Sequence, residues 1–178
     1  MFDKMGAMAT WSEFAVAAPA LAGTVRDALH QYGPGLAYLA TIRPDGGPRL
    51  HPVSPAVLDG GLYCCLLDTP KRRDLDRDSR YALHAFPAED SDDEVCLRGH
   101  ARPVLDPAEV GRLAAALRAV PRVDWRLYDL RIDTAISVRR TGSLSREVWR
   151  DTPTHDSHTL AGITPTRISR PKILQPRQ

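Results

Sequence analysis

Apolar and polar residues alternate through the middle of the chain with a period of two, which is typical of half-buried β-strands. Residues 36–43 predict a buried strand, residues 44–47 a hairpin turn and residues 49–58 its partner strand. A second turn at residues 59–61 leads into an apolar run at residues 62–67. Three strands joined by tight turns predict an antiparallel meander.

The strand pattern continues in the second half of the chain. Residues 80–86 and 94–104 each predict a strand. In the latter, four apolar or small residues share one face: Val95, Leu97, Gly99 and Ala101. Residues 128–138 predict a long strand, or two joined by a bulge, and residues 144–150 a last strand that would help to close a barrel. The sequence therefore predicts a mainly β fold, a β-barrel with α, of six to seven antiparallel strands with flanking helices.

Helical patterns flank this sheet. The spacing of Thr10 and Glu13 predicts a capping box, and apolar residues recur at helical spacing through residues 14–29, with a break at Pro19. A second capping box begins at Asp106 and opens another amphipathic helix. We expect the N-terminal helices to cover one end of the barrel.

The chain of 178 residues, 43% of them hydrophobic, fits one domain with tails. Residues 1–9 lack periodicity and predict a disordered leader, residues 10–151 form the domain, and residues 152–178 predict a flexible basic tail. His155 and His158 lie in this tail without a third ligand nearby, so no metal site is expected.

Charge and cysteine usage narrow the partners and the compartment. The formal net charge of +2 gives no reason to expect a nucleic-acid partner. The three cysteines lack metal-ligand spacing, and Cys64 and Cys65 are adjacent on a strand, so their side chains point to opposite faces. No apolar run approaches the roughly 18 residues of a membrane span. We expect a cytoplasmic protein without a membrane partner.

The junction between the apolar run and the next helix, at residues 67–75, is typical of a phosphate site. Thr69 is placed to cap the helix, and Pro70 suits its first position. Lys71, Arg72 and Arg73 follow at once, so backbone N–H groups, the helix dipole, a hydroxyl and cations would converge on one anion. The alternative for this run taken alone is a solvated basic helix start.

Five short segments, in this order, resemble the flavin-binding split β-barrels related to pyridoxamine 5′-phosphate oxidase: residues 39–46, 48–53, 59–63, 71–75 and 78–83. The resemblance implies a split β-barrel in which the strand at residues 49–54 lies along the flavin ring. It also implies that the turn at residues 69–72 holds the ribityl phosphate. The candidate cofactor-binding residues are Arg49, His51, Pro52, Val53, Ser54, Asp68, Thr69, Lys71 and Arg72.

Several of these residues have a second interpretation. His51 is either close to the flavin or a partly exposed strand histidine. Pro52 and Pro55 remove two ladder donors, which indicates an edge strand or a bulge where a ligand replaces the ladder. Trp149 either lines the site or belongs to the core.

The resemblance implies a flavin (FMN)-binding oxidoreductase that moves a hydride between the flavin and a small-molecule substrate, in a homodimer with the flavin site at the interface. The alternatives are an F420-dependent reductase on the same fold and, in another class, a non-catalytic flavin or haem binding protein. The sequence contains no Gly-x-Ser-x-Gly elbow and no Gly-x-Gly-x-x-Gly after a strand, which disfavours a hydrolase and a Rossmann site. Residues 143–158 do not match the substrate-phosphate segment of true pyridoxamine phosphate oxidases, so we expect no appreciable turnover of pyridoxamine 5′-phosphate.

Overall fold

The computed structural model describes residues 8–117, 123–140 and 144–151. Within these ranges the chain forms four helices and eight strands. They are α1 (Trp11–Ala17), α2 (Pro19–His30), β1 (Ala37–Ile42), β2 (Pro48–Val53), β3 (Ala56–Leu58), β4 (Gly61–Leu67), α3 (Pro70–Arg77), β5 (Arg80–Ala85), β6 (Glu94–Pro103), α4 (Pro107–Ala116), β7 (Trp125–Arg139) and β8 (Ser145–Arg150).

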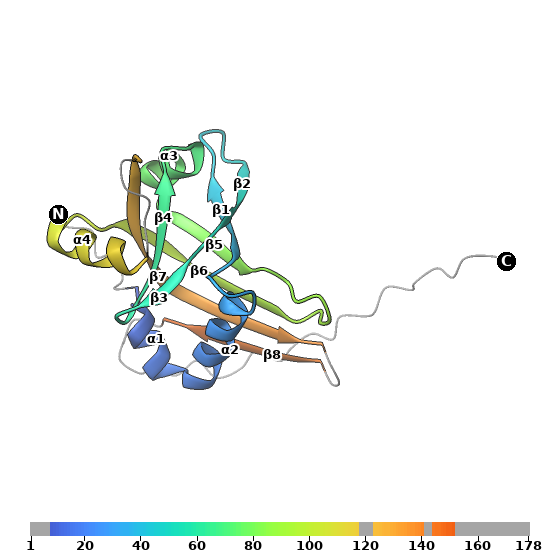
Figure 1. Cartoon of the computed structure of the whole chain (residues 1–178). Helices are drawn as coiled ribbons and strands as arrows, with labels where there is room; N and C mark the ends of the chain where they lie inside the picture. Colours follow the sequence, from blue (N-terminus) through green and yellow to red (C-terminus); the bar gives the residue numbers. More distant parts are fainter. Residues whose placement is uncertain (1–7, 118–122, 141–143, 152–178) are drawn as a thin grey trace, which may run out of the picture.

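The strands form one antiparallel sheet in the order β2-β1-β5-β6-β7-β4-β3, with β8 paired to β7. The two outermost strands of this order, β2 and β3, are separated in the chain only by Ser54 and Pro55. The sheet must therefore curl until its edges approach each other, which gives a half-barrel (Figure 1). The long strand β7 pairs with β4 through its first residues and with β8 through its last, so the sheet divides along this strand. The predicted mainly β, antiparallel fold with flanking helices is confirmed.

Both hairpins of the predicted meander are present, since β1 pairs with β2 and β3 pairs with β4, but the predicted middle strand is broken in two. The segment at residues 49–58 forms two short strands, and β4 lies at the far side of the sheet from β1 and β2. Pro52 and Pro55 explain the break, because neither can donate to a ladder. The same two prolines correctly predicted that β2 is an edge strand. Likewise, β8 branches from β7 instead of closing the barrel.

The outcomes for β6 and β7 agree with the sequence patterns. Along β6 the four predicted inward residues are buried and those between them are half-buried or exposed. A register shift between Arg98 and Gly99 places the expected bulge in β7. A Cβ on Gly99 would lie 1.8 Å from the backbone oxygen of Arg131, so this close approach of two strands requires glycine.

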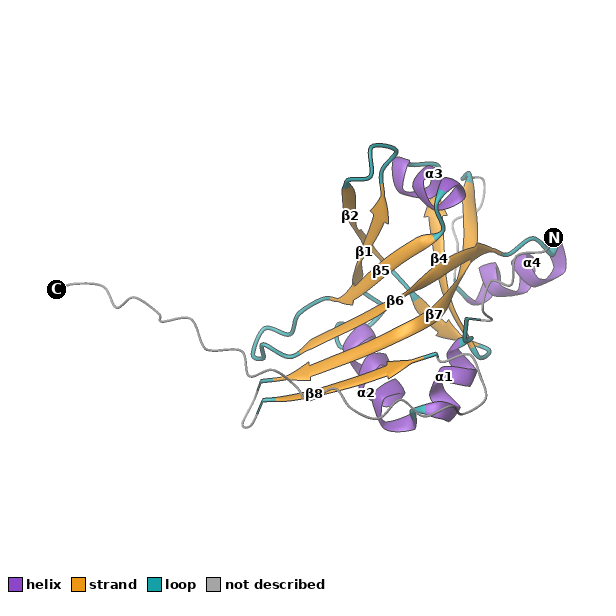
Figure 2. Ribbon diagram, turned by 180° about the vertical axis from the view of Figure 1, so that it is seen from behind, coloured by secondary structure: helices purple, strands orange, loops and turns teal. Residues whose placement is uncertain are grey.

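Different helices cover the two ends of the half-barrel (Figures 1 and 2). The first helices, α1 and α2, lie at one end; the capping box of Thr10 and Glu13 is present, and the break falls at Pro19 as predicted. They bury a large apolar surface into the core: Trp11, Phe14, Leu21, Ala22, Val25 and Leu29. The short helix α3 covers the opposite end, where it contacts β1 and β4.

Only part of the predicted N-terminal leader lies within the described residues. Ala9, assigned to the leader from the sequence, instead pairs with Ile132 through two backbone hydrogen bonds of 2.9 and 3.1 Å. Residues 1–7 and the tail at 152–178, including His155 and His158, lie outside the described residues. In the described part of the chain, no helix is long and apolar enough to cross a membrane.

Candidate cofactor site

The junction between β4 and α3 has the predicted backbone but not the predicted cap. Thr69 is the N-cap residue in extended conformation and Pro70 follows at the first helical position. However, the Thr69 hydroxyl donates to the carbonyl oxygen of Leu67 at 3.2 Å and accepts nothing from the helix. Its carbonyl oxygen instead accepts from the N–H groups of Arg72 and Arg73. The hydroxyl is therefore committed to the turn that precedes the helix.

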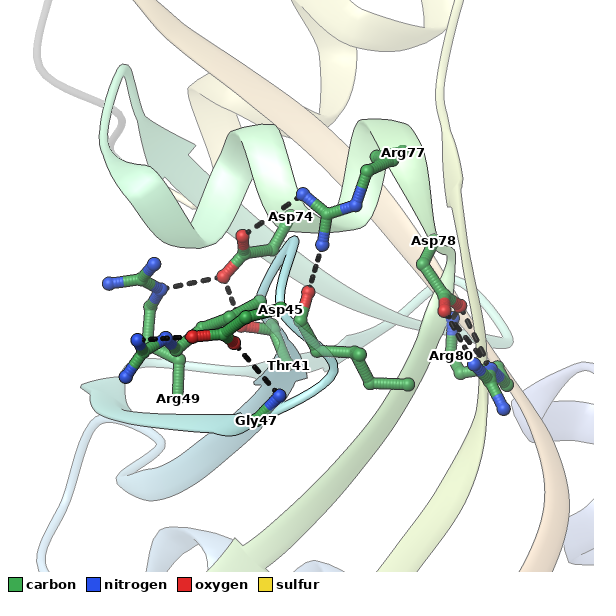
Figure 3. Close-up of polar contacts among 10 residues, drawn as sticks. Thr41, Asp45, Gly47, Arg49, Asp74, Arg77, Asp78 and Arg80 are labelled. Carbon is green, nitrogen blue, oxygen red and sulfur yellow. Dashed lines mark hydrogen bonds and ion pairs between the residues drawn. The ribbon is translucent and has the colours of Figure 1, made fainter.

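A buried carboxylate, Asp74, fastens α3 to the hairpin of β1 and β2 (Figure 3). One of its oxygens accepts from the Thr41 hydroxyl at 3.0 Å and from the Arg49 Nε at 2.6 Å. The other accepts from Arg77 at 3.4 Å, and Arg77 also donates to the carbonyl oxygen of Ile42. Burial raises the pKa of Asp74, but the hydrogen bonds from Arg49 and Thr41 outweigh it, so the net pKa is lowered. Asp74 is thus ionised at neutral pH.

Three of the predicted residues gather beside this carboxylate. Burial, together with the positive charges of Lys71 and Arg49, lowers the pKa of His51 below its ordinary value. The imidazole is therefore neutral at pH 7. Its Nε2 atom is buried and has no hydrogen-bond partner. Lys71 is half-buried and forms no ion pair with any described carboxylate.

Arg72 and Asp68 are arranged differently. Both terminal nitrogens of Arg72 donate to Asp124, at 3.0 and 3.1 Å, and one of them also lies 3.3 Å from Asp68. Asp68 in turn lies 3.6 Å from Arg73. Two of the three predicted cations are therefore balanced by carboxylates, and Lys71 is the one without such a partner among the described residues.

The remaining predicted residues divide between the two faces of β2. Arg49, His51 and Val53 alternate on the inner face, and Val53 belongs to the apolar core. Pro52 and Ser54 are exposed, so they do not share the inner face with His51 and Arg49. The structure brings together Arg49, His51 and Lys71, and does not add Pro52 or Ser54 to them.

The sequence interpretation missed Asp74, Thr41 and Asp124. Asp74 is one of two aspartates among the eight residues of α3, and no local pattern distinguishes the buried one. Its one signal was position, four residues after Pro70 and beside Leu75, the other buried residue of α3. Trp149 was interpreted from the sequence as either a site residue or a core residue. Its ring centroid lies 4.9 Å from that of Phe14, which supports the interpretation as a core residue.

Other titratable groups and cavities lie apart from this cluster. Burial raises the pKa of the Cys64 thiol to about 12, so it is protonated and a poor nucleophile. His100 shares a 2.9 Å hydrogen bond with the Ser79 hydroxyl, and His84 contacts the carbonyl oxygen of Ala85. A cavity of about 490 Å³ lies near the other end of the sheet, between α2, the end of β5 and β7, and none of the predicted residues lines it. No group of three metal-ligating side chains occurs in the described ranges.

No protein-family model matches the chain, and no curated protein matches it in sequence. Solved structures do match. A heme binding protein from Mycobacterium smegmatis has a TM-score of 0.52 and 22% identity, over 69% of this chain and 57% of that one. A protein of unknown function from Agrobacterium tumefaciens has a TM-score of 0.54 and 26% identity, over 67% of this chain and 56% of that one. This chain thus spans somewhat more than half the length of each.

A third match covers nearly all of its counterpart. A protein related to general stress protein 26, of the pyridoxinephosphate oxidase family, from Clostridium acetobutylicum has a TM-score of 0.52 and 12% identity, over 78% of this chain and 95% of that one. Identities this low carry the architecture and not the chemistry. The chain has the split-barrel fold of the pyridoxamine phosphate oxidase-like proteins.

Proposed function

We propose that the protein is an FMN-binding oxidoreductase whose cofactor phosphate binds where β2 meets the start of α3. The observation that carries the proposal is that Arg49 and His51 share the inner face of β2, where Arg49 is bonded to Asp74 of α3 and the charge of Lys71 acts on His51. Lys71 and the terminal nitrogens of Arg49 have no carboxylate partner in the described structure, and His51 Nε2 is buried without a hydrogen bond. Buried polar atoms of this kind are normally satisfied, so a ligand that supplies the missing partners fits here.

Each residue has a distinct task in this proposal. Lys71 and Arg49 neutralise the phosphate, with the first turn of α3 adding its dipole. His51, uncharged at neutral pH, offers one hydrogen bond to a polar edge of the ligand without adding a further positive charge. When bound, a flavin ring supplies hydride transfer, and the protein supplies its orientation and its shielding from water.

The test is an absorption spectrum of the purified protein followed by parallel titrations with FMN, F420 and haem. We expect FMN to bind and Lys71→Ala to weaken it by about 1.5–3 kcal/mol, the value of a charge-assisted contact. Arg73→Ala is the matched control, because this neighbouring cation is exposed and lies beside Asp68. Binding of F420 alone would favour a deazaflavin reductase instead. An FMN affinity that does not change in Lys71→Ala would remove Lys71 from the site.

Haem binding is the second candidate, and His51 favours it. A neutral imidazole with an unpartnered Nε2 is a competent iron ligand, and one protein of the same fold, from Mycobacterium smegmatis, is described as heme binding. A Soret band that disappears in His51→Ala but persists in Lys71→Ala would establish this alternative. A Soret band that survives His51→Ala would exclude His51 as the ligand.

We further propose that the protein is a homodimer that uses the outer face of β2. Leu50 is 61% exposed there, and an apolar groove of about 270 Å³, lined in part by Ala40, Ile42 and Pro48, lies beside it. Exposed apolar surface on an edge strand favours association. Light scattering should give a dimer, and Leu50→Glu should give a monomer; a monomeric parent chain would contradict the proposal.

A further inference from the structure

Asp74 is unusual among the charged residues of α3 because its side chain is 3% exposed. Burying a carboxylate is costly unless hydrogen bonds and opposite charges compensate. Here the compensation comes from three separate elements, with Thr41 on β1, Arg49 on β2 and Arg77 on α3 itself. An exposed residue would serve a surface helix equally well, so the buried position calls for a specific explanation.

The atom that Asp74 engages on Arg49 supplies that explanation. Of the three guanidinium nitrogens of Arg49, only Nε donates to Asp74, at 2.6 Å. The two terminal nitrogens of Arg49 lack a partner in the described structure. Asp124 treats Arg72 in the opposite way, because it occupies both terminal nitrogens in a bidentate pair. The bidentate arrangement is the one that neutralises an arginine most completely. The Nε contact fixes the guanidinium and leaves its donors available.

We propose that Asp74 is a positioning residue for phosphate recognition, holding Arg49 by Nε so that its terminal nitrogens receive a phosphate monoester. This inference rests on the proposed function and identifies how the same site recognises the phosphate group of its ligand. A terminal guanidinium edge binds phosphate oxygens in pairs, and fixing it in advance removes the entropic cost of ordering a long side chain. Thr41, which donates to the same carboxylate oxygen, restricts Asp74 in turn.

Positioning and simple charge balance predict opposite signs for one substitution. If Asp74 only neutralised the site, Asp74→Asn would remove a negative charge and FMN would bind more tightly. Under the positioning role, FMN binds about tenfold more weakly, because Arg49 loses its charge-assisted anchor. Riboflavin, which lacks the phosphate, should change by less than about twofold, since the loss is confined to the phosphate contact.

The matched control is Asp76→Asn, the same substitution on the same helix at a carboxylate that accepts from Arg126 and Tyr128 and has no contact with Arg49. Its ratio of FMN to riboflavin affinity should stay at the parent value. A double-mutant cycle completes the test: in an Arg49→Gln background, Asp74→Asn should have no further effect on FMN. Arg49→Gln also covers the case in which Asp74→Asn does not fold, because Arg49 is half-buried and its own loss should affect FMN and not riboflavin.

The outcomes separate the two proposals. Parent protein that binds neither FMN nor riboflavin refutes the proposed function, and inorganic phosphate then tests Asp74 directly. The NMR signal of the Arg49 Nε–H should shift with phosphate in the parent chain and not in Asp74→Asn; no shift in either overturns the inference. Where FMN does bind, tighter binding in Asp74→Asn, or equal losses for FMN and riboflavin, overturns it as well.

Discussion

The two ends of the half-barrel are covered by helices that are attached in opposite ways. At one end, α1 and α2 bury six apolar side chains, and three of them, Phe14, Leu21 and Val25, are completely inaccessible. At the other end, α3 buries only one apolar side chain, Leu75. Its remaining attachments are polar: Asp74 to β1 and β2, and Asp76 to Arg126 and Tyr128 of β7 at 2.7 and 2.5 Å.

Because of this difference, the α1 and α2 end is suited to stabilise the fold and the α3 end is suited to bind a ligand. Apolar burial is non-directional and stabilises a fold without defining where any one donor points. Charge-assisted hydrogen bonds contribute less net stability but define direction. The α3 end is therefore suited to hold cations at set positions for a ligand, whereas the α1 and α2 end is suited to hold the barrel closed.

The largest effect that sharpens this contrast is expected from Phe14→Ala. Phe14 is fully buried and contacts both Trp11 and Trp149, so its truncation should lower the free energy of unfolding by about 3–5 kcal/mol. Denaturant titration measures this loss. FMN affinity, measured where the variant is still folded, should equal that of the parent chain, because the main contacts of α3 are with β1 and β4 and not with α1 or α2. A matching loss of affinity would show that the ends are not independent.

Acid should release the α3 end before the α2 end. Hydrogen bonds from Arg80 lower the pKa of Asp78, the C-cap residue of α3, to about 2 from its ordinary 3.8. A carboxylate whose pKa is lowered by folding contributes stability above the unfolded value, and this is lost as the pH falls through the folded value. Asp78→Asn should therefore cost about 1 kcal/mol at pH 6 and almost nothing near pH 2, the size expected for a partly exposed ion pair.

Amide hydrogen exchange between pH 5 and 2 locates this loss. The amides of α3 should lose protection as the pH falls while those on the buried face of α2 retain theirs, because α2 is held by apolar contacts. Equal loss of protection in both helices would contradict the contrast between the ends.

Local patterns predicted the parts of this molecule that depend on neighbouring residues. The hairpin turns, the capping box at Thr10, the break at Pro19 and the bulge in β7 each follow from residues within one short segment. The two prolines of the β2 region likewise identified an edge strand. The strand order could not be obtained this way, because the pairing of β4 with β7 joins residues far apart in the chain, such as Tyr63 and Asp129.

In the candidate site, too, features set by neighbouring residues were predicted and features set by distant residues were not. The cation-rich start of α3 was visible because Thr69, Pro70 and Lys71 are consecutive. The carboxylates that set the availability of each cation were not visible. Asp124 is 52 residues from Arg72, and Asp74 meets Arg49 from 25 residues away. Which arginine is occupied and which is available is therefore a property of the tertiary fold.

The smallest expected effect concerns this difference between the arginines. Asp124→Asn should free one terminal nitrogen of Arg72 and leave the other close to Asp68, 3.3 Å away. Because Asp124 is 72% exposed, the pair is worth about 0.2–1 kcal/mol, so FMN affinity should rise by at most about fivefold. The gain should shrink in high salt, which screens the interaction of the released cation with the phosphate. Asp124→Asn in an Arg72→Ala background is the control and should change nothing. An affinity that falls in the single variant would mean that Asp124 supports the site by holding the start of β7 against α3, and that Arg72 is not a phosphate ligand.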